Sequence, residues 1–165
     1  MNEYEVCAIS SYSEEQTALI GEMVSRHAFS GLVFLLEGEL GAGKTTLVRG
    51  FCRAEGCSNV RSPSFTLVNR YDCKGRTVVH SDFYRLSRVD PVELDIESYM
   101  DPDCVLFIEW ADRGLPWDFD QLWRIRFDVF TDLDDVRVIK FSAEGDRAKR
   151  ALVLLFSDLK REKML

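Results

Sequence analysis

One stretch of the chain, residues 38–45, limits the fold more than any other. Its sequence, G-E-L-G-A-G-K-T, fits the phosphate-binding loop pattern G-x-x-x-x-G-K-[ST]. The apolar run 32–36 leads into this loop and is typical of a strand buried on both faces. Residues 45–55 follow with apolar side chains at helical spacing, and Gly56 is typical of a helix C-terminus. Strand, glycine-rich loop and helix therefore occur in the order that a phosphate site needs.

The chemistry of this loop comes from its backbone and from two side chains. Glycines let backbone N–H groups turn toward phosphate oxygens, and the helix N-terminus adds positive potential there. Lys44 is expected to reach the terminal phosphates, and the Thr45 hydroxyl is expected to bind Mg²⁺. We therefore predict a nucleotide-binding site that consists of Gly38, Glu39, Leu40, Gly41, Ala42, Gly43, Lys44, Thr45 and Thr46.

Length and charge narrow the class of protein. A chain of 165 residues is long enough for one domain with its own core, and we predict a single domain over 1–165. The net charge of −7 disfavours direct binding to nucleic acid, because proteins that grip a phosphate backbone usually carry a basic face. No apolar run approaches the roughly 20 residues of a membrane span. The acidic segment 1–5 starts no signal peptide, so we expect a cytoplasmic protein that contacts no membrane.

The five cysteines are odd in number and scattered in spacing. Cys52 and Cys57 lie four residues apart, but no second Cys or His pair follows at the spacing of a zinc site. We therefore expect reduced thiols that pack as small hydrophobic side chains.

A polar segment follows the first helix after the loop. Pro63 excludes a helix here and favours an extended loop. In P-loop proteins the segment in this position often senses the terminal phosphate through a hydroxyl and Mg²⁺. Ser62, Ser64 and Thr66 are candidates for this switch-like role. The alternative is a polar loop that only leads into the next strand.

Glu109 directly follows the apolar run 105–108, which is the Walker B pattern. A carboxylate at the C-terminal end of a buried strand, beside the P-loop, can hold Mg²⁺ or its bound waters. Asp82 likewise ends a predicted strand. The two acids are expected to flank the P-loop.

The remaining patterns complete an α/β fold. We predict a single P-loop NTPase-like domain with a mixed, mainly parallel sheet, antiparallel hairpins and flanking helices. The hairpin of 122–129 and 136–141 is expected at a sheet edge, and a C-terminal helix over about 148–160 is expected as an appendage. Further strands are expected at about 4–9, 65–71 and 77–84, and further helices from Ser13 and over about 90–100.

Four motifs together resemble the bacterial TsaE (YjeE) family. They are the P-loop continued to Gly50, S-P-S-F-T-L-V at 62–68, H-S-D-F-Y-R-L at 80–86 and I-E-W at 108–110. The resemblance runs from about residue 13 to residue 143. Ser64 stands where the family more often has Thr, a change that keeps the hydroxyl group.

The resemblance implies a small ATPase that uses ATP and Mg²⁺ in the synthesis of tRNA threonylcarbamoyladenosine (t⁶A). This modification lies at position 37 of tRNAs that read codons starting with A. In the family, the protein docks on the TsaB–TsaD pair, and TsaD transfers the threonylcarbamoyl group. ATP binding and hydrolysis support turnover of that complex, and tRNA is contacted only through the complex.

The resemblance also implies roles for individual residues. Thr45 and Glu109 lie on the metal side, and Asp82 holds a metal-bound water or orients the attacking water. Trp110 is expected beside the nucleotide site, where it could also face a partner; the alternative is core packing beside the sheet. The segment 11–14 is a candidate to border the adenine.

Two other functions fit a P-loop. A small-molecule kinase would need an acceptor pocket and usually a lid rich in arginines, and the chain shows no such insertion. A nucleotide-gated binding module would use hydrolysis only as a timer. Arg85 and Arg113 are the candidates for an arginine finger, but neither is in an evident finger position, so we expect slow hydrolysis that partners accelerate.

Overall fold

The computed structural model describes residues 7–85, 95–111, 118–130 and 136–164. These residues form seven strands, three α-helices and a short 3₁₀ helix, η1 (Ile96–Tyr99). The helices are α1 (Glu14–His27), α2 (Lys44–Ala54) and α4 (Asp146–Arg161). The strands are β1 (Cys7–Ser11), β2 (Val33–Glu37), β3 (Val68–Asp72), β4 (Thr77–Asp82), β5 (Cys104–Glu109), β6 (Leu122–Val129) and β7 (Arg137–Glu144).

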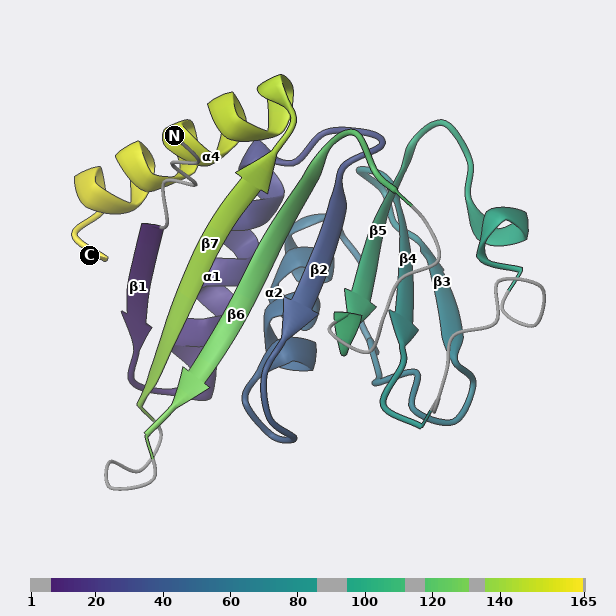
Figure 1. Ribbon diagram of the computed structural model, residues 1–165, viewed down its shortest axis with the longest axis horizontal. Helices are drawn as coiled ribbons and strands as arrows, with labels where there is room; N and C mark the ends of the chain where they lie inside the picture. The colour runs from purple at the N-terminus through teal and green to yellow at the C-terminus, as the bar shows by residue number, and fades with distance from the viewer. Residues whose placement is uncertain (1–6, 86–94, 112–117, 131–135, 165) are drawn as a thin grey trace.

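All seven strands belong to one mixed sheet in the order β1-β7-β6-β2-β5-β4-β3 (Figure 1). The four central strands β6, β2, β5 and β4 run parallel to one another. Antiparallel pairs β6–β7, β1–β7 and β3–β4 complete the two sides. The predicted α/β fold, with a parallel centre and antiparallel hairpins, is confirmed. The C-terminal ends of β2, β5 and β4 therefore meet at one end of the sheet.

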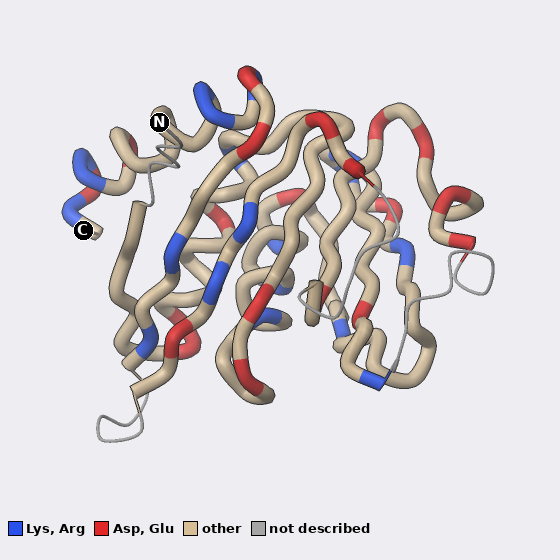
Figure 2. The backbone as a smooth tube through the Cα atoms, in the orientation of Figure 1, with Lys and Arg blue, Asp and Glu red and all other residues tan. Residues whose placement is uncertain are grey.

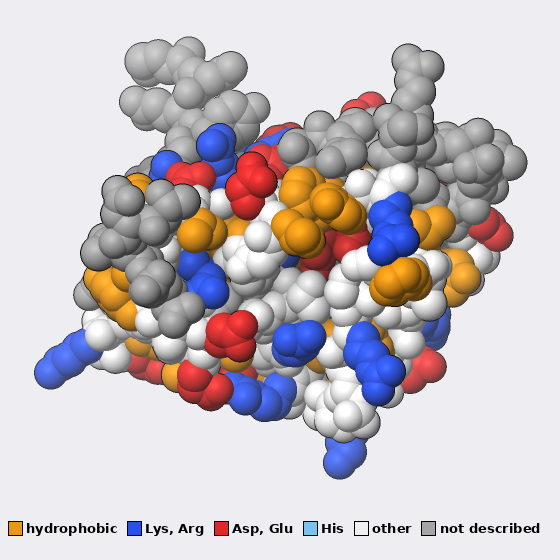
Figure 3. Space-filling view, turned by 90° about the horizontal axis from the view of Figure 1, so that it is seen from below, with side chains coloured by type: hydrophobic (Ala, Val, Ile, Leu, Met, Phe, Trp, Pro, Cys, Tyr) orange, Lys and Arg blue, Asp and Glu red, His pale blue; other side chains and the backbone are white. Residues whose placement is uncertain are grey.

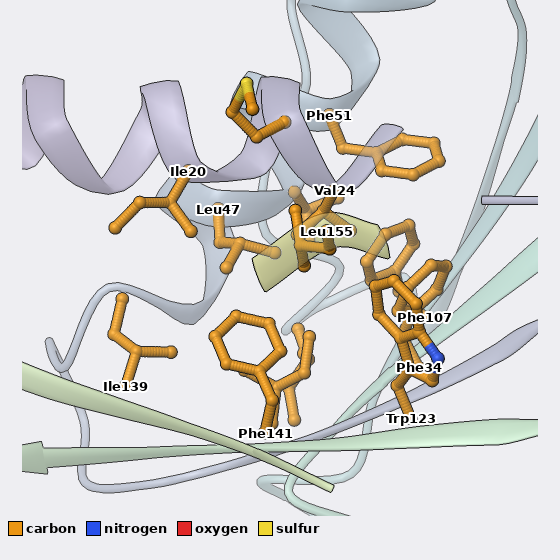
Figure 4. Close-up of a cluster of buried hydrophobic side chains, with 14 of the residues drawn as sticks. Ile20, Val24, Phe34, Leu47, Phe51, Phe107, Trp123, Ile139, Phe141 and Leu155 are labelled. Atoms are coloured by element: carbon orange, nitrogen blue, oxygen red, sulfur yellow. The ribbon is translucent and has the colours of Figure 1, made fainter. Parts of the chain in front are cut away.

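The main core lies between the sheet and the three α-helices, which cover the same face (Figures 1 and 4). Phe34 of β2 and Phe107 of β5 stack with ring centroids 4.3 Å apart, and Phe51 of α2 meets both rings edge-on. Trp123 of β6 is fully buried beside Phe34, and its indole N–H donates to the backbone of Ala148. The aromatic side chains thus join β2, β5, β6 and α2 into one packed unit.

Two glycines allow α1 and α2 to touch through their backbones. A Cβ atom on Gly50 would lie 1.9 Å from the carbonyl oxygen of Ala18, and one on Gly21 would lie 2.1 Å from that of Leu47. Neither helix could carry a side chain at these positions without moving away from its neighbour. This close approach fixes the helix after the P-loop against α1.

The opposite face of the sheet carries a smaller apolar cluster over its parallel strands. Val79, Leu106 and Ile108 belong to it, and Ile96 of η1 packs there. Basic residues occur along both β6 and β7 (Figure 2). The basic side chains on this face pair with acids: Arg124 with Glu37, and Arg126 and Lys140 with Asp128.

The hairpin of β6 and β7 does not lie at a sheet edge, so that expectation was wrong. β6 pairs with β2, and β1 adds to the outer side of β7 and becomes the edge strand. The alternating pattern of β7 shows that one face is buried, but it does not show whether another strand pairs beside it.

The predicted helix over 90–100 is not confirmed where it can be compared. Its first part, 90–94, lies outside the described residues. Asp95 has a left-handed backbone conformation with φ of 38°, and only the 3₁₀ helix η1 follows. A left-handed residue cannot continue an α-helix, so no α-helix runs through this point.

The expectation of reduced thiols at all five positions was also wrong. Cys57, just beyond α2, forms a disulfide with Cys73 in the β3–β4 turn. Cys7, Cys52 and Cys104 are free. Burial, together with the charge of Glu55, raises the pKa of the Cys52 thiol to about 12, in line with a packing role there. The pairing depends on the hairpin folding back against the end of α2, which cysteine spacing does not reveal.

The C-terminal helix α4 is part of the main core rather than an appendage. Leu155 and Leu159 are fully buried in the cluster that also contains Val24 of α1 and Phe141 of β7.

In the described part of the chain, no helix is both long enough and apolar enough to cross a lipid bilayer.

Candidate nucleotide site

The P-loop lies between β2 and α2, as its sequence predicts. Gly43 has a φ of 107° and forms the N-cap of α2, and Gly38 has a φ of 142° at the start of the loop. A Cβ atom on Gly38 would also lie 2.8 Å from the carbonyl oxygen of Phe127. Both positions therefore favour glycine for their backbone conformation, and Gly38 also for the space available.

Lys44 is only 4% exposed and lies within the curve of the loop. Its ammonium group donates to the carbonyl oxygens of Gly38 and Glu39 at 2.7 and 2.9 Å. The same nitrogen lies 4.2 Å from the ring centroid of Trp110, close enough for a cation–π contact. A cation is thus held where the loop can receive phosphate oxygens.

A cleft of about 290 Å³ opens over this loop. It brings together the loop, the start of α1, the polar segment after α2 and the ends of β4 and β5. The lining residues are Glu14, Leu40, Gly41, Ala42, Gly43, Lys44, Thr45, Thr46, Ser62, Ser64, Asp82, Glu109 and Trp110. Two predicted site residues, Gly38 and Glu39, do not line the cleft, but their carbonyl oxygens accept hydrogen bonds from Lys44. Thr66, a third predicted residue, does not line the cleft.

Figure 3 looks onto this end of the sheet and shows acidic side chains in a hollow beside hydrophobic ones. Leu40 at the tip of the P-loop and Phe65 in the polar segment are 71% and 83% exposed. The guanidinium of Arg85 lies over the Phe65 ring, with 4.3 Å between the charge centre and the ring centroid. The cleft therefore has large apolar side chains near its rim that contribute little to the core.

Glu109 lies at the end of β5 and is only 3% exposed. Its Oε1 accepts a hydrogen bond from the Thr45 hydroxyl at 2.7 Å and lies 2.8 Å from Nε2 of His80. Burial alone would raise the pKa of Glu109, but the hydrogen bonds from His80 and Thr45 and the charge of Lys44 lower it below its usual value. An ionised carboxylate is therefore stabilised beside the P-loop.

Asp82 lies at the end of β4, next to Glu109 in the parallel register. Its Oδ2 accepts hydrogen bonds from the hydroxyls of Ser62 at 3.1 Å and Ser64 at 3.0 Å. Its Oδ1 accepts from the backbone N–H of Tyr84. Thr66 instead donates to Asn69 on an exposed surface. The structure joins two of the three switch-like hydroxyls to Asp82 and leaves the third outside.

Strand geometry explains why these side chains converge. Side chains two residues apart on a strand point to the same face. Val78 of β4 and Phe107 of β5 belong to the helix-covered core, so His80, Asp82 and Glu109 face the same side, toward α2. In open α/β sheets, ligands bind beyond the C-terminal ends of the strands, where both acids lie.

The oxygen atoms at this site suit Mg²⁺. Mg²⁺ prefers oxygen ligands, and it is usually held by one or two carboxylates, waters and substrate phosphates rather than by a cage of protein ligands. Thr45, Asp82 and Glu109 supply one hydroxyl and two carboxylates. No cluster of three or more His, Cys, Asp or Glu residues that could hold a metal occurs within the described ranges.

Two residues at the site were not singled out by sequence reasoning. His80 belongs to the H-x-D spacing, and that spacing on a strand could have placed it on the same face as Asp82. Arg137 of β7 is 7% exposed and donates from Nε to the carbonyl oxygen of Ala42 in the P-loop at 3.0 Å. No local pattern links a residue so far along the chain to the loop, so only the sheet topology reveals this contact.

The chain is similar to known proteins over most of its length. The family model described as "Threonylcarbamoyl adenosine biosynthesis protein TsaE" matches residues 11–138. The tRNA threonylcarbamoyladenosine biosynthesis protein TsaE of Haemophilus influenzae is 36% identical over 137 residues, which cover 79% of this chain and 82% of that protein. The protein of the same name from Bacillus subtilis is 34% identical over 137 residues, covering 81% and 83%.

The fold is similar as well. A crystal structure of YdiB from Bacillus subtilis superposes with a TM-score of 0.73 at 27% sequence identity, and the match covers 99% of each chain. The matched region of the family model contains the P-loop, both acidic strand ends and the serine segment. The chain therefore belongs to the TsaE family.

Proposed function

We propose that this protein binds and hydrolyses ATP with Mg²⁺, and that this activity supports N⁶-threonylcarbamoylation of adenosine 37 in tRNAs that read codons starting with A. The observation that carries the proposal is the cleft over the P-loop, where Lys44, Thr45, Asp82 and Glu109 meet. The names of the relatives supply the pathway. A cytoplasmic location goes with this proposal.

Each residue then has a definite task. The backbone N–H groups of the loop and the Lys44 ammonium bind the phosphates and offset their charge. Thr45, Glu109 and Asp82 would hold Mg²⁺ or its waters, and the cation would offset charge that develops on the phosphate oxygens. Asp82, through its hydrogen bonds with Ser62 and Ser64, couples the polar segment to the same site. A change at the phosphates can thereby reach the exposed Phe65.

We propose that partners, TsaB and TsaD, complete the function. Leu40 and Phe65 near the rim of the cleft are apolar and exposed, as expected of a surface that a protein partner covers. The net charge of −7 and the paired basic residues on β6 and β7 fit contact with tRNA only through that complex. Hydrolysis by the isolated chain should be slow and should rise when both partners are present.

The central test is the variant Lys44→Ala. We expect it to lose Mg-ATP binding, because the cation that faces the phosphates is gone, while the fold persists. Calorimetry measures the affinity, and circular dichroism measures the fold. Lys149→Ala, at an exposed position of α4, is the matched control and should bind like the wild type. In a reconstituted mixture with TsaB, TsaD and tRNA, only Lys44→Ala should lose t⁶A formation over several turnovers. Unchanged Mg-ATP affinity in Lys44→Ala would contradict the proposal.

A further inference from the structure

His80 is the feature of the site that the proposed function leaves unexplained. Its side chain is fully buried at the middle of the sheet, next to a carboxylate. Its neighbours on the same face are Val78 and Asp82 on its own strand and Phe107 directly opposite on β5, with Glu109 two residues beyond Phe107. Packing against Val78 and Phe107 alone would favour an apolar side chain. The buried imidazole is therefore expected to have a polar role at this position.

We propose that His80 is a positioning residue: its Nε2–H donates a hydrogen bond to Oε1 of Glu109 and holds that carboxylate in place for the cation. This inference rests on the proposed Mg-ATP site. It gives the Walker B carboxylate a partner on the neighbouring strand.

The surroundings of the ring decide which nitrogen carries the proton. Nε2 lies 2.8 Å from Glu109 Oε1, whereas Nδ1 is buried without a hydrogen-bond partner among the described residues. A proton on Nδ1 alone would leave a buried donor unsatisfied and would point the Nε2 lone pair at a carboxylate oxygen. A proton on Nε2 satisfies the carboxylate and leaves only an unused acceptor at Nδ1. A ring that carries its proton on Nε2 therefore fits the site better than one with a proton on Nδ1 alone.

The hydrogen bond from His80 also determines which carboxylate oxygen of Glu109 stays available for a ligand. Both hydrogen bonds to this carboxylate, from His80 and Thr45, end on Oε1, and Oε2 makes none within the described part of the chain. The Thr45 hydroxyl donates its proton to Glu109 and keeps its lone pairs for a cation. Hydrogen bonds from a second layer of residues commonly orient the carboxylates that face a metal. His80 would thus fix one oxygen of Glu109 and leave the other available.

The first experiment compares His80→Leu with His80→Gln. The glutamine amide nitrogen can replace Nε2 as a donor, whereas leucine fills the space without one. Binding of the β,γ-imido analogue of ATP is measured by calorimetry over a series of Mg²⁺ concentrations. We expect His80→Leu to need about 10–100-fold more Mg²⁺ for the same affinity, which is the typical loss when such a partner is removed. His80→Gln should stay close to the wild type, and nucleotide affinity without Mg²⁺ should be the same in all three proteins.

The second experiment observes the ring in the nucleotide-free protein. The chain has only two histidines, so a ¹⁵N-labelled histidine spectrum contains two imidazoles. His27→Gln, at the end of α1, assigns them by removing one. We expect a pyrrole-type signal for Nε2 of His80, and Glu109→Gln should perturb it. This readout needs no nucleotide and no well-folded His80 variant.

Two results would overturn the inference. One is a pyridine-type signal for Nε2 of His80, and the other is a wild-type Mg²⁺ requirement in a folded His80→Leu protein. If the wild type binds no nucleotide at all, the proposed function fails instead. The NMR experiment then still decides whether His80 holds Glu109 through Nε2.

Discussion

At the scale of single residues, the nucleotide site concentrates charges that are almost completely buried. Lys44, Asp82 and Glu109 are 4%, 3% and 3% exposed. A buried charge is costly unless it is hydrogen-bonded, and each of these has at least two hydrogen bonds. These charged groups are therefore held by hydrogen bonds from the protein itself, and their ionisation should influence the stability of the whole domain.

The ionisation of Glu109 predicts how the free energy of unfolding depends on pH. Its pKa in the folded protein is lowered below the value of about 4.3 for an unfolded chain. Such a group stabilises the fold fully above the unfolded-state pKa, and this contribution disappears as the pH falls through the folded-state pKa. The free energy of unfolding should therefore fall less in Glu109→Gln than in the wild type between about pH 6 and about pH 3.

Urea unfolding at several pH values, with EDTA present to exclude divalent cations, measures this difference. Glu97→Gln, at an exposed position of η1, is the matched control and should keep the wild-type pH dependence. Equal pH dependence in Glu109→Gln and the wild type would show that the carboxylate is not stabilised in its ionised form.

At the scale of elements, the β3–β4 hairpin is fastened to the C-terminal end of α2. The Cys57–Cys73 disulfide spans this junction, and Arg76 forms an ion pair with Glu55 at 2.9 Å. The backbone N–H of Gly75 donates to the carbonyl oxygen of Glu55, and a Cβ atom on Gly75 would lie 2.0 Å from a Glu55 carboxylate oxygen. The chain between the two cysteines contains the serines that contact Asp82, so this junction closes a loop that reaches the nucleotide site.

Reduction of this disulfide should lower the stability of the protein. The cysteines are 16 residues apart in sequence. In the chain-entropy model, a crosslink that closes a loop of about 15 residues contributes about 3 kcal/mol to the free energy of unfolding. Dithiothreitol should therefore lower the urea midpoint of the wild type. It should have no effect on a Cys57→Ala/Cys73→Ala variant, which serves as the control. A wild-type midpoint that does not respond to complete reduction would count against a stabilising bridge.

At the scale of the whole molecule, α1, α2 and α4 share one core with the sheet. α4 contributes Leu155 to the centre of that core, while the adjacent Leu154 is 58% exposed. Leu155, Val24 of α1 and Leu47 of α2 belong to the same buried cluster, which Figure 4 draws. The last helix of the chain thus packs against α1, which in turn packs closely against α2, the helix that follows the P-loop.

Leu155→Ala should therefore destabilise the whole domain, by about 2–5 kcal/mol, because a fully buried leucine is replaced and a cavity remains. Leu154→Ala, next to it in sequence, should change the free energy of unfolding by less than about 0.5 kcal/mol. Chemical denaturation monitored by circular dichroism measures both. Similar small effects for the two variants would support the original expectation of an appended helix.

Much of the fold could be predicted because its signals are local. The P-loop, its strand and its helix follow from glycine positions and apolar spacing within about 25 residues of sequence. The carboxylate of Glu109 could be placed because a buried strand has a fixed direction and ends at a defined side of the sheet. The resemblance to the TsaE family drew on these same segments, and the family assignment is confirmed.

What the sequence alone determined was therefore the identity of the elements and the chemistry at their ends. Only the tertiary structure decided which distant groups meet: Cys57 with Cys73, Arg137 with the P-loop, and His80 with Glu109. It also joined Ser62 and Ser64 to Asp82 while leaving Thr66 on the surface. The reason is physical: backbone conformation and apolar periodicity depend on neighbouring residues, whereas strand order, helix docking and the contacts between them depend on packing of the whole chain.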